Sequence, residues 1–491
     1  MSQRRIYSSA APIDFAAIRA EQNVPTAFSP EVEADAAAAV AAGPFVAPDR
    51  DDRTDLPLVT VDPPGSMDLD QAVHLTRADD GLGYVVHYAI ADVAAWVRPG
   101  GPVDEESWRR GQTLYSPDLS TPLHPRALSE GAGSLLPDQR RPAVLWTITL
   151  DTAGEVTDVG LERAWVRSLA RLDYPGVQAD VTAGTLHPSI ALLPDVGKLR
   201  QGLARQRHAL TLDLPDVEIV ATGGTGRARG WDLVLRALPD VEAWNAEISL
   251  LTGMCAARIM LDGGVGILRT LPDPSDKQVA ELRRATAALG IPWPDGVAPA
   301  DVVAQLDPAE PRQAAFLEYA VKLLRGADYH PFDRDSTDHP TPERTGHAGI
   351  GAPYAHVTAP LRRLVDRFGT EICLALHAGR PVPGWARDRL GELPAVMGSS
   401  AQRASALEKA CTGAVGAFLL AGREGDVFPA TVLQVDREKD RARLVLDDPP
   451  VRATCPADGV AEGEQVRVEL VAADPATHTY TVRLADRAGA T

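Results

Sequence analysis

The stretch from Leu58 to Val73 constrains the fold more than any other part of the chain. Its β-branched start, Leu58 to Val61, predicts a short buried strand, which the following Asp-Pro-Pro-Gly interrupts. The loop then carries Asp68 and Asp70 into a second, alternating strand. Side chains two positions apart in an extended segment point to one side, so we expect both carboxylates to lie within reach of Asp62.

Three carboxylates that meet at one point repel one another unless a cation lies between them. Carboxylate oxygens are the ligands that Mg²⁺ selects, so the spacing predicts a metal site at Asp62, Asp68 and Asp70. The alternative is a solvated turn, because Asp and Gly are common turn residues and most Asp-rich loops are of that kind. The stretch alone does not decide between the two.

Length and charge limit the classes of protein that the chain can be. Its 491 residues predict two or three domains. No apolar run is as long as a membrane span and the start lacks a signal-peptide core, so we expect a cytoplasmic monomer without a membrane partner. The net charge of −18 argues against a broad nucleic-acid-binding surface, but it leaves room for a narrow channel lined with arginine.

The sequence pattern predicts an α+β fold in three parts. Residues 1–45 form a small helical unit, with helices expected at 13–21 and 30–42; the unit is either a helix-turn-helix or a packing arm. Residues 46–423 form a large mixed catalytic domain. Residues 424–491 are rich in alternating strands and fit a five-stranded barrel of the oligonucleotide-binding (OB) type.

Several loops have a local signature. Residues 79–83 and 151–155 each predict the turn of a β-hairpin. The glycine-rich run at 221–230 lacks the Gly-Lys-Ser/Thr ending of a phosphate loop and is interpreted as a third hairpin. The charged run at 49–55 is expected to be a solvated connector.

A second polar segment begins at Thr358, which predicts a helix N-cap with Pro360 in the first turn. Arg362 and Arg363 would then lie near a helix N-terminus, where the helix dipole disfavours cations. An anion bound at that end would reverse the penalty, since backbone N–H groups and guanidinium groups both bind phosphate. The alternative is an ordinary ion pair between Arg362 and Asp366, one turn apart.

Together these segments resemble the RNase II/RNase R family of exoribonucleases. The similar motifs run in order from about residue 46 to the end of the chain: the acidic loop, Ile90 to Ala94, Tyr115 to Asp118, Pro122 to Pro125, Tyr354 to Arg363, and the terminal barrel. The resemblance implies a Mg²⁺-dependent 3′→5′ exoribonuclease, with Mn²⁺ as an alternative metal. Its substrate would be single-stranded RNA, with partial access to structured RNA, and its products nucleoside 5′-monophosphates.

The same resemblance implies roles for individual residues. The residues implied to hold the metal are Asp62, Asp68, Asp70 and Gln71. The residues implied to act in catalysis are Asp68, Asp70, Arg362 and Glu408. The residues implied to contact RNA are Tyr115, Tyr354, Thr358 and Arg363. Tyr115 would stack on the 3′-terminal base, its alternative role being that of a half-buried loop tyrosine.

The chain departs from the family at Gln71, where the family carries a further Asp, so the site has one negative charge fewer. One alternative is therefore a catalytically weak or inactive RNA-binding protein on the same fold. A third is a phosphodiesterase acting on short oligonucleotides. The family's N-terminal cold-shock barrels are also missing, because residues 1–45 cannot hold them.

Overall fold

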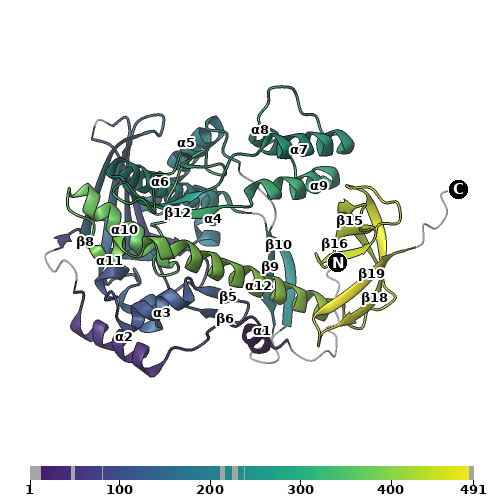
Figure 1. The fold of residues 1–491 in the computed structure, drawn as a ribbon, viewed down its shortest axis with the longest axis horizontal. Coiled ribbons are helices and arrows are strands. Elements are labelled where there is room, and N and C mark those ends of the chain that lie inside the picture. The colour runs from purple at the N-terminus through teal and green to yellow at the C-terminus, as the bar shows by residue number, and fades with distance from the viewer. Residues whose placement is uncertain are drawn as a thin grey trace.

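The computed structural model describes residues 13–45, 50–79, 81–210, 216–223, 230–236 and 238–485. It has the predicted α+β fold, with a large mixed unit and a five-stranded barrel at one end (Figure 1). The long helix α12 (Leu393–Leu420) runs from the large unit to the barrel. Over these ranges no helix has the length and apolar character needed to cross a membrane. The exact domain boundaries given above stay a prediction.

A six-stranded sheet is the frame of the large unit. Its strands are β1 (Asp51–Asp52), β2 (Leu58–Asp62), β3 (Gln71–Arg77), β4 (Tyr84–Ala91), β7 (Arg140–Leu150) and β8 (Val156–Asp173). The order is β1-β8-β2-β3-β4-β7, and β8 also pairs with β7, so the sheet curls back on itself. The strand expected at 58–61 and the hairpins expected at 79–83 and 151–155 are confirmed. The acidic loop therefore links two central strands.

Helices and short strands surround this sheet. They are α3 (Pro102–Arg110), β5 (Leu114–Ser116), β6 (Leu119–Thr121), α4 (Tyr174–Ala183), α5 (Leu193–Gln206), α6 (Asp240–Gly263), β11 (Val265–Thr270), α7 (Asp276–Leu289), α8 (Pro299–Val303), α9 (Pro311–Ala320), β12 (Asp328–Asp333), β13 (Gly346–His347), β14 (Ala352–Pro353), α10 (Leu364–His377) and α11 (Gly384–Arg387). The main core lies between the sheet and α6 and α10, around Trp146, Ile248 and Phe368. A separate core that includes Leu69 and Leu361 holds the acidic loop against the turn before α10.

The two N-terminal helices form as expected but do not pack as one unit. α1 (Phe15–Glu21) is capped by Asp14, and α2 (Pro30–Ala42) is capped by Ser29. α1 joins the apolar core of the barrel and α12, whereas α2 joins a separate core together with residues of α3. Residues 13–45 are therefore a packing arm and not a helix-turn-helix.

The expected solvated connector at 49–55 is confirmed for the exposed Asp51, Asp52, Arg53 and Asp55 and is wrong for Arg50. Arg50 is buried, and its guanidinium lies 2.7 Å from Oδ2 of the equally buried Asp92. The two residues that follow, Asp51 and Asp52, form β1 and pair with β8. The charged run is ordered because a buried carboxylate needs a cationic partner. Asp49 lies outside the described residues.

Strands β9 (Asp216–Thr222) and β10 (Gly230–Arg236) pair antiparallel, as expected of a hairpin at 221–230. The turn itself, residues 224–229, lies outside the described residues. The hairpin packs on α12, which also contacts the barrel.

The C-terminal barrel matches its prediction. Its strands are β15 (Val427–Asp436), β16 (Arg441–Leu446), β17 (Arg452–Pro456), β18 (Gln465–Asp474) and β19 (Thr479–Leu484). The order is β17-β16-β15-β18-β19, and contacts between β17 and β19 nearly close the sheet. Its core continues into Leu407 and Val415 of α12 and into Phe15 and Ile18 of α1.

Candidate active site

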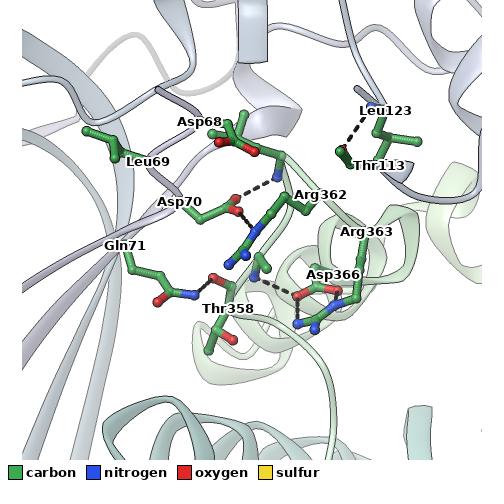
Figure 2. A network of polar contacts seen from close by, with 12 residues as sticks. Asp68, Leu69, Asp70, Gln71, Thr113, Leu123, Thr358, Arg362, Arg363 and Asp366 are labelled. Atoms are coloured by element: carbon green, nitrogen blue, oxygen red, sulfur yellow. Dashed lines mark hydrogen bonds and ion pairs between the residues drawn. The ribbon is translucent and has the colours of Figure 1, made fainter. Parts of the chain in front are cut away.

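Two segments far apart in the sequence meet around Asp70 (Figure 2). One is the acidic loop between β2 and β3, and the other is the turn that leads into α10. Asp70 is only 1% exposed. Its Oδ1 accepts a hydrogen bond from the backbone N–H of Leu361 at 2.7 Å, and its Oδ2 accepts one from Nε of Arg362 at 2.8 Å. The acid that pairs with Arg362 is therefore Asp70, and not Asp366.

Asp62, Asp68 and Asp70 carry more negative charge than the single guanidinium beside them can neutralise. Burial raises the pKa of Asp70 to about 7, although Arg362 opposes the shift. Burial also raises the pKa of Asp62 to about 6, and the charge of Asp68 adds to it. Burial works against the Arg362 guanidinium, but Asp70 outweighs it and raises the pKa of Arg362. One arginine therefore does not satisfy three carboxylates in this space.

The three carboxylates do not converge as tightly as the spacing predicted. Among the described residues, no three His, Cys, Asp or Glu side chains form a group that could hold a metal ion. The residues nevertheless suit a hard cation, because Oδ2 of Asp62 is buried and has no hydrogen-bond partner within the described part of the chain. The charge of Asp68 acts on both Asp62 and Asp70, which links the three acids electrostatically.

Gln71 connects the two segments through both ends of its amide. Its Nε2 donates to the carbonyl oxygen of Thr358 at 2.6 Å, and its Oε1 accepts from the hydroxyl of Tyr88 at 2.7 Å. A backbone carbonyl can only accept, which fixes the amide orientation. Sequence reasoning missed Tyr88, although the β3–β4 pairing places it opposite Val73 and therefore on the same face as Gln71.

Thr358 is not an N-cap, so that prediction is wrong. Helix α10 begins at Leu364 with Arg363 as its N-cap residue. Thr358 is 1% exposed, and its hydroxyl lies 2.8 Å from that of Ser249. The N–H of Leu361, which an N-cap at Thr358 would have accepted, donates instead to Oδ1 of Asp70 at 2.7 Å. Its side chain is occupied by contacts within the protein, and its expected contact with RNA stays a prediction.

Asp366 pairs with Arg363 and not with Arg362. Nε and Nη2 of Arg363 each donate to one Asp366 carboxylate oxygen at 2.8 Å. The carboxylate is fully buried, and although burial alone would raise the pKa of Asp366, Arg363 outweighs it and lowers the pKa. The Arg363 guanidinium is thus occupied by its buried contact with Asp366. Arg362 is therefore the arginine that faces the acidic loop.

The remaining candidates lie in different surroundings. Tyr115 on β5 is 54% exposed, and its hydroxyl lies 3.5 Å from Oδ2 of Asp68. Tyr354 is buried between the rings of His347 and His356, and its expected contact with RNA stays a prediction. Glu408 is exposed on α12. Its charge acts on the Cys411 thiol, whose pKa burial raises to about 12.

Comparisons with known proteins agree with this arrangement. Residues 50–370 match the model of the RNB domain, and residues 426–485 match the RNase II-type exonuclease C-terminal S1 domain. Exoribonuclease 2 of Sodalis glossinidius is 34% identical over 231 residues, which are 45% of this chain and 35% of that protein. Ribonuclease R of Escherichia coli is 29% identical over 329 residues, 65% of this chain and 39% of that protein.

A solved structure shows the same fold. Mycoplasma genitalium RNase R, in complex with ribose methylated single-stranded RNA, superimposes with a TM-score of 0.83 at 20% identity. The match covers 96% of this chain and 77% of that one. The sequence matches to the two curated relatives span well under half of their length.

Proposed function

Because the chain belongs to the RNase II/RNase R family, we propose that it is a 3′→5′ exoribonuclease that hydrolyses single-stranded RNA to nucleoside 5′-monophosphates. The observation that carries the proposal is the setting of Asp70, a buried carboxylate held by the Leu361 N–H and the Arg362 guanidinium. A pKa raised to about 7 beside two further acids is typical of a site built for chemistry. A protein that only bound RNA would have no use for it.

We assign a divalent cation, Mg²⁺ with Mn²⁺ as the alternative, to Asp62, Asp68 and Asp70. When bound, such a cation activates water and stabilises the charge that develops on the phosphate and the leaving oxygen. The buried and unpartnered Oδ2 of Asp62 supports this assignment, because carboxylate oxygen is the preferred ligand. A positive charge there would counter the burial and the Asp68 charge that raise the pKa values of Asp62 and Asp70.

Arg362 is assigned to the phosphate at the scissile bond. Its Nε is held by Asp70, and 38% of the side chain is exposed, so part of the guanidinium is open to a ligand. Holding one nitrogen on Asp70 fixes the direction of the others, which lowers the cost of orienting them when the phosphate arrives. A guanidinium fixed in this way stabilises charge on phosphate oxygens as it develops.

RNA contacts are assigned to Tyr115 and to the barrel. The exposed ring of Tyr115 can stack on the 3′-terminal base, a contact that every base can make. A hollow of about 580 Å³ on the barrel is lined by the basic residues Arg437, Lys439, Arg441 and Arg443 and by the acidic Asp436 and Glu438, so basic residues are in excess. This local positive charge suits a phosphate backbone in a chain whose net charge is −18.

The second candidate is an RNA-binding protein with little or no hydrolytic activity. The observation that favours it is Gln71, whose amide is bonded to Thr358 and Tyr88 and adds no charge to the acids. A metal site with one carboxylate fewer would bind its cation less tightly.

Incubation of end-labelled single-stranded RNA with Mg²⁺ or with EDTA tests both candidates. We expect cleavage to mononucleotides with Mg²⁺ and none with EDTA, and we expect Asp70→Asn to abolish cleavage while RNA affinity stays within a few-fold. The matched control is Asp333→Asn, because Asp333 is another shielded carboxylate held by an arginine, Arg387. Cleavage by Asp70→Asn at the wild-type rate would contradict the assignment, and binding without cleavage by the wild type would favour the second candidate.

A further inference from the structure

The hairpin of β5 and β6 that carries Tyr115 has little support of its own. Its two strands pair only with each other, through Leu114↔Thr121, Tyr115↔Ser120 and Ser116↔Leu119. An isolated two-stranded hairpin is marginally stable in water, so its position depends on what packs against it. At its base, the N–H of Thr113 donates to the carbonyl oxygen of Arg362 at 2.9 Å. That contact fixes the base but not the tip.

Helix α1 holds the tip. Nη1 of Arg19 donates to Oγ of Ser116 at 2.7 Å and to Oδ1 of Asp118 at 2.5 Å. Oγ of Ser116 in turn donates to the carbonyl oxygen of Leu119, the first residue of β6. The side chain of Arg19 is 7% exposed and that of Asp118 is 35% exposed, so the ion pair is partly shielded from water and is stronger than one between two fully exposed side chains. One side chain of α1 therefore contacts the turn of the hairpin at two points.

Apolar packing fixes α1 in place. Phe15 and Ile18 are buried in the same core as Leu114 of β5. The ring of Phe15 lies edge-on to that of Trp231 in β10, with centroids 5.1 Å apart. Figure 1 shows α1 below α12, between β5–β6 and the barrel. The helix is thus a firm support from which Arg19 can position the hairpin.

The chain that follows α1 is joined through Arg110 of α3 to the residue that follows the hairpin. Arg110 donates to the carbonyl oxygens of Pro25 and Ala27 in this segment, and to that of Pro122 just after β6. The N-terminal arm therefore borders the hairpin at its tip and near the end of β6, with Tyr115 between the two.

We propose that Arg19 is a positioning residue, and that α1 sets where Tyr115 stands relative to Asp68 and so how short an RNA the site still retains. The inference rests on the proposed function, because it assigns Tyr115 to the 3′-terminal base. Without the Arg19 contacts the turn of the hairpin loses its ion pair to α1 and keeps the contact of Arg126 with the carbonyl oxygen of Ser120 and the packing of β5 on α12. The turn then moves more, and the Tyr115 ring meets the base at a less fixed distance from the acids. A long RNA has other contacts to hold it, whereas a short one depends on this stacking.

The test compares Arg19→Ala, Arg19→Lys and Asp118→Ala with the wild type. We expect Arg19→Ala and Asp118→Ala to leave final products at least one nucleotide longer, and to raise KM about fivefold for a short RNA near the final product length. Turnover of a long RNA should stay within twofold. Arg19→Lys should restore part of the effect, because an ammonium group can still pair with Asp118. The double variant Arg19→Ala/Tyr115→Ala should behave like Tyr115→Ala alone.

The matched control is Asp14→Ala. Asp14 caps α1 through the N–H of Ala17 and does not touch the hairpin, so its loss weakens the helix but keeps the Arg19 contacts. Its products should match those of the wild type. Wild-type products from Arg19→Ala, or equally long products from Asp14→Ala, would overturn the proposal.

Affinity for the same short RNA, measured in EDTA, separates this proposal from the proposed function. A wild type that does not cleave would refute the function. In that case weaker binding by Arg19→Ala would still support the positioning role, and equal binding would overturn it.

Discussion

Replacing Gln71 by glutamate changes one atom of the contact between the acidic loop and the turn before α10. In the wild type, Nε2 of Gln71 donates to the buried carbonyl oxygen of Thr358 at 2.6 Å, and Oε1 accepts from Tyr88. Glutamate has the same shape, so the Tyr88 hydroxyl keeps an acceptor. The Thr358 carbonyl, however, meets a carboxylate oxygen where it had a donor. The hydrogen bond is lost and two acceptors face each other.

The size of the effect follows from the burial of Thr358, which is 1% exposed. A buried acceptor left without a donor costs about 1–3 kcal/mol, so Gln71→Glu should lower the free energy of unfolding by about that amount at pH 8. Protonation of the new carboxyl restores a donor, which raises its pKa in the folded state above the unfolded value of about 4.3. The contribution of the protonated carboxyl to the free energy of unfolding is therefore fully present below about pH 4.3. It is lost as the pH rises through the pKa of the folded state.

Urea unfolding followed by tryptophan fluorescence at pH 5.5, 7 and 8 measures this difference. We expect the gap between wild type and Gln71→Glu to narrow as the pH falls. The control is Gln71→Met, which has a similar length but no polar atom, so its gap should not depend on the titration of residue 71. A Gln71→Glu protein as stable as the wild type at pH 8, or a gap that is the same at all three values, would refute the bridging role of Gln71.

Three further predictions concern the site and its approach. Arg362→Lys should lower kcat by about 10²-fold or more through lost charge stabilisation, while Arg387→Lys, in the pair with Asp333, should leave kcat unchanged in the same RNA assay. Burial and the charge of Arg367 lower the pKa of His124 to about 3, so the unfolded chain takes up a proton between pH 7 and 5 that the folded chain does not. Urea unfolding should therefore show that the free energy of unfolding of the wild type falls by about 2 kcal/mol more than that of His124→Gln between about pH 7 and 5. An equal fall in both proteins would contradict the buried neutral state of His124. Finally, the chain of residues 1–491 should digest a 3′-tailed hairpin at least partway into the stem, because the described N-terminal segment that borders the Tyr115 hairpin is the short helix α1 and its connector; stalling several nucleotides before the stem would refute this.

The parts of the fold that sequence reasoning predicted are those fixed by neighbouring residues. The β-branched run at 58–61 and the turn at 79–83 specify their strands locally, and the alternating strands after residue 426 specify the barrel. The start of α10 was misplaced because the usual signal, a polar side chain before a proline, was present at Thr358. Its carbonyl and hydroxyl are instead bonded to Gln71 and Ser249, partners that no local pattern indicates.

Local sequence patterns were also insufficient to predict which charged side chains pair. The spacing allowed a pair of Arg362 with Asp366, but the chain direction before the helix places Arg363 on Asp366 and turns Arg362 toward Asp70, 292 residues away. Burial has a similar effect on Tyr354, whose motif suggested RNA contact but whose ring packs into the core. Residue types indicated the chemistry of the site, whereas tertiary packing decided which side chain of each motif faces it.

The contacts of Arg362 explain how Asp70 and Arg362, which are 292 residues apart in the sequence, are held in a fixed relative position. Its Nε is held by Asp70, and its carbonyl oxygen accepts from the N–H of Thr113 at the base of the Tyr115 hairpin. The tip of that hairpin is held by Arg19. Hydrogen bonds, together with the short chain segment from Thr113 to Ser116, therefore connect the N-terminal helix to the buried acid. Because these contacts join different elements, a movement of the hairpin would displace both Tyr115, the proposed base contact, and Arg362, the proposed phosphate contact. A site that must hold the last base and the bond behind it at a fixed separation gains from such a connection, and a freely moving hairpin could not provide it.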